Sequence, residues 1–132
     1  MVIDSHRRNK LIDLDSGIYI AVFYMPRTKT IQIGRLGKFY FRRGIYFYVG
    51  SAQRNLPARL ERHGRKKKLL HWHIDYLSAK TKMLGAIMIP GRRKRECEIA
   101  RELTELFELV VPRFGASDCM CAGHLFYADQ LP

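Results

Sequence analysis

The sequence predicts an α/β (α+β) domain in which antiparallel strands are packed against helices. In its first half, short runs rich in β-branched and aromatic residues alternate with glycine or proline turns, which is typical of strands. After Gly50 the apolar residues recur at helical spacing. The chain has 132 residues, 47% of them hydrophobic, and no repeat or low-complexity linker, so we expect a single domain over residues 1–132.

Five segments are predicted to be strands. The run 17–24 is apolar on both faces, which predicts a central strand, and Pro26 ends it. Three shorter strands are expected at 30–33, 38–41 and 45–49. Because the connections between these four segments are tight, they predict an antiparallel meander. The fifth strand, 83–89, is a buried apolar run.

Three helices are predicted in the second half. Asn55 is placed to cap the first, with Pro57 in its opening turn and Gly64 as its stop. Apolar residues on one face predict the other two helices at 69–79 and 96–109. We expect a loosely ordered lead-in over residues 1–15 and an irregular tail over residues 114–132.

The chain carries a large positive charge, with 24 Lys and Arg against 12 Asp and Glu, a formal net charge of +12. This excess favours a polyanionic partner such as nucleic acid, although a merely very basic protein has the same composition. The run 17–25 is the longest apolar stretch, and it is far shorter than the ~20 residues that span a bilayer. The start of the chain is polar and basic, so we expect a cytosolic location.

Two tyrosines and one basic helix are the first candidates for chemistry. Tyr19 and Tyr48 lie in strands beside glycines, where packing is the ordinary role of a tyrosine, although a phenol can also act as a base on water. Arg59 and His63 share a helical face at i, i+4. They are either a phosphate-binding surface, or a guanidinium that holds a scissile phosphate beside a second phosphate ligand or proton donor.

Glu96 is a carboxylate in line with the apolar face of its predicted helix, and four cationic residues precede it. A group in that position needs a partner. The partner is either a cation of the chain or a hard metal, because one carboxylate with phosphate oxygens and waters suits Mg²⁺.

Further basic and aromatic residues are candidates for binding a nucleic acid. Trp72 could stack on a base, although a buried structural role is the alternative for it and for its neighbouring histidines. The candidates for contact with a polyanion are Arg54, Arg62, Arg65, Lys66, Lys67, Lys68 and His73.

Soft metal ligands are concentrated near the end of the chain. Cys119, Cys121 and His124 are closely spaced, and Cys97 brings the set to three cysteines and one histidine, the number that tetrahedral zinc needs. The spacing is not that of a common zinc finger. Packed free thiols are therefore the alternative to a structural zinc site.

These residues together resemble a known family. Gly17-Ile18-Tyr19 and Tyr48-Val49-Gly50 resemble the paired signatures of the GIY-YIG nucleases, and residues 50–63 resemble that family's strand-to-helix segment with its arginine. The wider chain, over about 16–127, is similar to the Uri-type endonucleases of that superfamily. The matching segments of that branch are 72–77, 96–98, 114–119 and 124–126.

The resemblance implies a small three-stranded antiparallel sheet flanked by helices, and hydrolysis of DNA phosphodiester bonds with one divalent ion, Mg²⁺ or Mn²⁺. It implies that Tyr19 and Tyr48 activate or orient water, that Arg59 binds the phosphate with help from His63, and that Glu96 holds the metal. We expect a structure-specific, repair-related enzyme, with specificity from the substrate or a partner protein. The alternative is a non-cleaving nucleic-acid-binding module on the same fold.

Three departures from the family pattern bear on these roles. The two signatures lie far apart in the sequence, which predicts an inserted β-hairpin over residues 26–43, and Gly44-Ile45-Tyr46 imitates the first signature. Compared with the family pattern, one extra residue lies between Gly50 and Arg59, so Arg54 remains a second candidate for the family's arginine. The family's asparagine has no counterpart, and that region offers Ser117, Asp118 and His124 instead. Helical phase favours Glu96 over Glu98 as the metal ligand.

Overall fold

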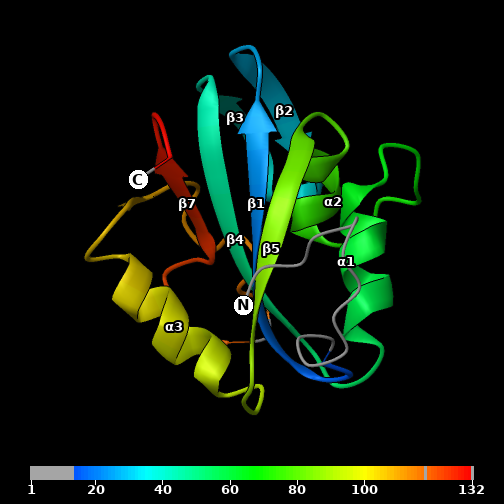
Figure 1. The fold of residues 1–132 in the computed structure, drawn as a ribbon. Helices are drawn as coiled ribbons and strands as arrows, with labels where there is room; N and C mark the ends of the chain where they lie inside the picture. Colours follow the sequence, from blue (N-terminus) through cyan, green and yellow to red (C-terminus); the bar gives the residue numbers. More distant parts are fainter. Residues whose placement is uncertain (1–13, 118, 132) are drawn as a thin grey trace.

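The first strand, β1 (Gly17–Met25), lies between two partners in a five-stranded antiparallel sheet (Figure 1). The computed structural model describes residues 14–117 and 119–131. β1 pairs with β4 (Gly44–Ala52) on one side and with β5 (Lys82–Ile89) on the other. β1 is therefore an interior strand, as the sequence predicts, with one face buried and Ile20, Val22 and Tyr24 of the other face partly buried.

The chain does not form the four-stranded meander predicted from its tight turns. The inserted hairpin is present as β2 (Lys29–Ile33), a short 3₁₀ helix η1 (Gly34–Leu36) and β3 (Gly37–Phe41), but β2 and β3 pair only with each other. The nine-residue strands β1 and β4 match in length and pair along their whole course, which leaves the five-residue hairpin strands outside the sheet.

Helices cover both faces of the sheet. α1 (Leu56–Gly64), α2 (His73–Ser78) and the hairpin pack on one face, where Leu56, Leu60 and Ile74 join the larger core. α3 (Arg95–Leu103) packs on the other face through Ile99 and Ala100. Figure 1 shows this arrangement, with α3 on the opposite side of the sheet from α1 and α2. No helix within 14–117 and 119–131 is long and apolar enough to cross a membrane.

The sheet has two strands more than the three that the family resemblance implies. β7 (Leu125–Ala128) pairs with β4, and β6 (Glu108–Leu109) pairs with β7 at the edge. The tail is therefore not irregular throughout, because its apolar run Leu125 to Tyr127 is buried in the sheet. The third helix also ends earlier than predicted, at Leu103, and Phe107 stacks on Phe47 with ring centroids 4.6 Å apart.

The start of α2 and the cap of α1 differ from the sequence prediction. α2 begins at His73 rather than at 69, because the Asp75 carboxylate accepts the backbone N–H groups of His71 and Trp72 and holds that segment outside the helix. Asn55 is the first residue before α1, but its side chain makes no capping hydrogen bond. Asp15 supplies the acceptors, through its carbonyl to the Leu56 N–H and its carboxylate to the Asn55 N–H. This part of the predicted lead-in is held in place, and residues 1–13 lie outside the described part of the chain.

Candidate functional site

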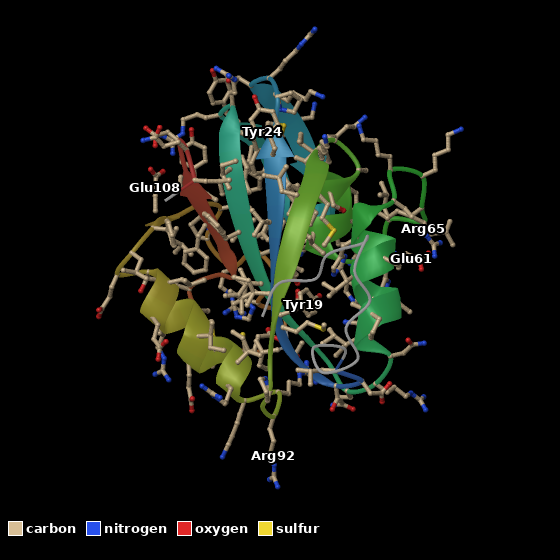
Figure 2. The ribbon with its side chains drawn as sticks, viewed as in Figure 1. Tyr19, Tyr24, Glu61, Arg65, Arg92 and Glu108 are labelled. Carbon is tan, nitrogen blue, oxygen red and sulfur yellow. A yellow bond between two sulfur atoms is a disulfide. The ribbon has the colours of Figure 1, made fainter. Side chains whose placement is uncertain are left out.

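A cleft of about 770 Å³ opens at the end of the sheet where β1 begins and β4 ends. Helices from both layers meet there, α1 and α2 from one face and α3 from the other. Tyr24 and Tyr19 mark the two ends of β1 in Figure 2, Tyr19 at the cleft end. The lining residues come from all of these elements and from the segment after α3: Tyr19, Tyr48, Gly50, Ser51, Gln53, Arg54, Arg59, His63, His71, Trp72, His73, Arg93, Lys94, Glu96, Cys97, Gly115, Ser117 and Cys119.

The cleft contains all five residues to which the family resemblance gives a catalytic or metal-binding role. They are Tyr19, Tyr48, Arg59, His63 and Glu96. The strand register explains how the tyrosines meet. Tyr19 pairs with Gly50 and Ala21 pairs with Tyr48, so both phenols project from the same face as diagonal neighbours, with ring centroids 6.3 Å apart.

Tyr19 fits only because its cross-strand partner is a glycine. A Cβ on Gly50 would lie 2.5 Å from the Tyr19 hydroxyl and 2.5 Å from Cζ, well inside contact distance. The space lets the Tyr19 hydroxyl reach His63, where the oxygen lies 2.7 Å from Nε2. Both side chains are buried, at 2% and 1% exposure. The glycine of the second signature therefore makes room for the tyrosine of the first.

The protonation states of this pair follow from burial. Burial, and secondarily the nearby Lys68 ammonium, lowers the pKa of His63 to about 3, so the imidazole is neutral at neutral pH. Burial raises the pKa of the Tyr19 phenol far above its usual value, although the Arg59 guanidinium acts in the opposite direction. Both groups are therefore neutral at neutral pH, and the tautomer of His63 decides which of them donates in the hydrogen bond. The role of His63 as a second phosphate ligand or proton donor stays a prediction.

Tyr48 has a glycine of its own. Gly115 has a left-handed backbone with φ +69, and a Cβ there would lie 2.8 Å from Cε1 of Tyr48. The Phe114 ring contacts the Tyr48 ring edge-on, with centroids 6.1 Å apart. Burial raises the pKa of Tyr48 well above its usual value, and neighbouring Tyr19 adds to the effect. The segment after α3 therefore fixes the second tyrosine.

Arg59 is held with its charge available to a ligand. Its Nη1 donates to the Ser51 carbonyl at 3.0 Å, and its guanidinium lies 4.5 Å from the centre of the Trp72 ring. Among the described residues no carboxylate forms an ion pair with it. Arg54, the alternative arginine, also lines the cleft but is exposed. Arg59 is therefore the guanidinium that the fold positions.

Glu96 lies in the cleft and makes two contacts. Ser51 Oγ donates to Oε1 at 2.6 Å, and His124 Nδ1 lies 2.8 Å from Oε2, too poorly aligned for a straight hydrogen bond. Glu98 lies outside the cleft and contacts Arg95 at 3.8 Å. The helical phase that favours Glu96 over Glu98 agrees with this placement. The partners of Glu96 are thus a hydroxyl and an imidazole.

The four soft ligands named from the sequence converge on the cleft wall. The ligand atoms of Cys97, Cys119, Cys121 and His124 all lie within 4.8 Å of one another. Cys97 and Cys121 form a disulfide, and Cys119 is a free thiol. Cys97 and Cys119 also line the cleft.

Comparison with known proteins now gives the family. A family model described as "Domain of unknown function DUF123" matches residues 18–132. The chain belongs to the DUF123 family. The match covers every residue that lines the cleft, because the first of them is Tyr19. No curated protein and no solved structure matches the chain significantly.

Within this DUF123 chain, the residues expected to contact nucleic acid fall into two groups. Arg62 forms a two-pronged ion pair with the buried carboxylate of Asp75, at 2.6 and 2.9 Å. Burial raises the pKa of Asp75, but hydrogen bonds from Arg62, Trp72 and His71 outweigh it and lower the pKa overall. The charge of Arg62 is thus paired inside the fold, and its contact with nucleic acid stays a prediction.

Lys68 and His73 also have partners within the protein. Lys68 donates to the backbone carbonyls of Arg62 and His63 and to Ser78, and burial lowers its pKa to about 8. His73 Nδ1 accepts the Gly115 N–H at 2.9 Å, and burial lowers its pKa. The remaining candidates are exposed: Arg54, Arg65, Lys66 and Lys67. Arg65 lies on the outer side of α1 beside Glu61 (Figure 2).

Other lining residues of the DUF123 cleft were not among the sequence candidates. Arg93 and Lys94 line it, and the basic run directly before Glu96 is the signal that could have identified them. Ser51, which donates to Glu96, had no such signal. Of the possible replacements for the family asparagine, Ser117 lines the cleft and Asp118 lies outside the described residues.

The imitation signature at the far end of β4 has a structural role. The Tyr46 hydroxyl donates to the Arg42 carbonyl at 2.7 Å, and its ring packs on Phe41 and Tyr127. Tyr46 does not line the cleft. Gly44-Ile45-Tyr46 therefore contributes to the core beside the hairpin rather than to the site.

Proposed function

We propose that this protein is a metal-dependent endonuclease that hydrolyses DNA phosphodiester bonds in the manner of the GIY-YIG nucleases of the Uri type. The observation that supports it is the convergence of Tyr19, Tyr48, Arg59, His63 and Glu96 on one cleft from four separate elements. The net charge of +12 favours a polyanionic substrate. Arg54 and Lys94 on the cleft lining would contact the backbone of that substrate.

The side chains that line the cleft suggest a role for each residue in this reaction. Arg59 would bind the scissile phosphate, since a guanidinium fork matches two phosphoryl oxygens and stabilises the charge that grows on them. The Tyr19 hydroxyl would orient the attacking water. With His63 in its Nδ1–H tautomer, Nε2 would accept the phenolic proton as the tyrosine takes a proton from that water. Tyr48, fixed beside Tyr19, would complete the hydrogen bonding around the same water.

Glu96 is a suitable ligand for one hard divalent ion. A carboxylate offers about four acceptor sites, so the contacts from Ser51 and His124 leave some available. Mg²⁺ is commonly held by one or two carboxylates together with waters and substrate phosphates. Bound there, Mg²⁺ or Mn²⁺ would supply Lewis-acid stabilisation of the phosphate charge. A cytosolic setting and a role in repair belong to the same proposal.

The test is Mg²⁺-dependent nicking of branched, flapped, single-stranded and duplex DNA, with RNA versions of each. Wild-type protein should nick at least one substrate, and Arg59→Ala and Glu96→Ala should each lose about 100-fold or more in rate. Arg101→Ala is the matched control, because it removes an exposed arginine of α3, the helix that carries Glu96, from outside the cleft and should keep the wild-type rate. Equal activity in all four proteins would indicate a contaminant and refute the proposal. Binding without nicking by the wild type would replace it with the non-cleaving module.

A further inference from the structure

Four zinc-type ligands meet although they come from distant parts of the chain. Cys97 belongs to α3, whereas Cys119, Cys121 and His124 come from the segment that leads into β7. All four ligand atoms lie within 4.8 Å of one another. Three sulfurs and one imidazole nitrogen are a donor set that selects zinc over Mg²⁺, because soft ligands favour zinc and hard oxygens favour Mg²⁺.

Two sulfur–nitrogen separations in this cluster are close to those around a shared zinc ion, whereas the sulfurs of Cys97 and Cys121 are joined as a disulfide. Tetrahedral bonds of about 2.3 Å to sulfur and about 2.05 Å to nitrogen place a sulfur about 3.6 Å from the nitrogen. Cys119 Sγ lies 3.6 Å and Cys97 Sγ 4.0 Å from His124 Nε2. The Cys119 distance equals the sulfur–nitrogen edge of a tetrahedral zinc site, and the Cys97 distance is a few tenths of an ångström longer.

The other nitrogen of the same ring faces a carboxylate. His124 is 0% exposed, and its Nδ1 lies 2.8 Å from Glu96 Oε2. When Nε2 of a histidine binds zinc, Nδ1 carries the proton and commonly donates it to a carboxylate, which fixes the ring. Glu96 stands where that carboxylate is needed, and Nδ1 has no better acceptor among the described residues.

We propose that Cys97, Cys119, Cys121 and His124 bind one structural zinc ion, and that His124 transmits its position to Glu96. The ion would join α3 to the segment before β7 and would fix one wall of the cleft. The metal site does not depend on the proposed nuclease activity. Only its link to Glu96 bears on that activity.

The zinc form requires Cys97 and Cys121 to be reduced. Two electrons from a thiol or phosphine reductant, with two protons, convert their disulfide to two thiols. Zinc then replaces the protons of three thiols, so that three protons leave as three thiolates and one neutral imidazole bind. A reducing compartment favours the thiol form.

The test is metal analysis of the full chain purified with a phosphine reductant and without added chelator. We expect about one zinc per chain. Cobalt(II) loaded in its place should give the intense visible absorption of tetrahedral thiolate coordination. The Cys119→Ser/Cys121→Ser double variant should retain less than about a tenth of the metal, and Arg65→Ala should retain all of it.

Thiol counting separates the zinc site from a structural disulfide. Denatured wild-type protein that has not been exposed to reductant should yield all three thiols once its zinc is released. A single thiol and no zinc would overturn the proposal in favour of the disulfide. Stoichiometric zinc that persists in the double variant would overturn it as well. DNA nicking by a zinc-free wild type would refute the zinc site and leave the nuclease proposal intact. Bound zinc without nicking would refute the nuclease proposal and leave the zinc site intact.

Discussion

Replacing Gly50 by alanine should displace the Tyr19 phenol. The new Cβ would lie 2.5 Å from Cζ and from the hydroxyl, whereas ordinary contact begins at 3.4 Å, so the ring or the strand must shift by about 1 Å. Such a shift breaks the 2.7 Å hydrogen bond to His63. We expect Gly50→Ala to lower the free energy of unfolding by about 1–3 kcal/mol, as overpacked cores do. We expect the nicking rate to fall about 100-fold, because a misplacement of about 1 Å has that effect on catalysis.

Gly85→Ala is the matched control for this substitution. Gly85 lies on β5, which also pairs with β1, and a Cβ there meets no atom within 4 Å. Neither glycine has a positive φ, so backbone strain is absent in both variants. Urea unfolding measures the stability of the two variants, and initial nicking rates measure activity. If Gly50→Ala matches Gly85→Ala in stability, the close approach of Tyr19 to Gly50 does not exist and the reasoning fails.

Two further predictions concern stability. In the folded chain the pKa of His63 is about 3, below its ordinary value of 6.5. The contribution of neutral His63 to the free energy of unfolding is therefore complete above about pH 6.5, and it is lost as the pH falls toward 3. About 2 kcal/mol should disappear between pH 8 and pH 5. Urea unfolding at the two pH values should show a smaller loss for His63→Gln than for wild type, and equal losses would contradict the burial argument. Asp75→Asn removes the negative charge and one of the two oxygens that accept from Arg62, and should cost about 3 kcal/mol at pH 7. The pKa of Asp75 is lowered in the folded chain, so this difference should shrink as the pH falls below 3.8, and a difference independent of pH would rule out the ion pair as its cause.

Local sequence patterns predicted the parts of the fold that depend on a single segment. The runs that became β1, β4 and β5 are long and apolar, so their strand character was plain. The end of α3 was missed because apolar residues continue at helical spacing through Phe107, yet Phe107 packs on Phe47 instead. The four-residue β7 was missed because so short a run gives little periodic signal.

The candidate site shows the same limit. The two signature motifs indicated Tyr19 and Tyr48, and the i, i+4 spacing on a helix indicated Arg59 and His63. The structure places all four in one cleft. Arg62 could not be separated from Arg59 by sequence, because its buried partner Asp75 is thirteen positions away on another helix. Charge and spacing indicate which residues can bind an anion, whereas only the tertiary contacts show which of them are already paired.

The antiparallel pairing of β1 with β4 separates the insertion from the cleft. The register runs from Met25 opposite Gly44, where the hairpin leaves the sheet, to Tyr19 opposite Gly50, where the tyrosines meet. A segment added at the first end lengthens the connection without moving any residue at the second. The two halves of the signature can therefore drift far apart in sequence while they stay adjacent in space. The hairpin end is thus a position where related chains can gain or lose whole elements without displacing the residues of the cleft.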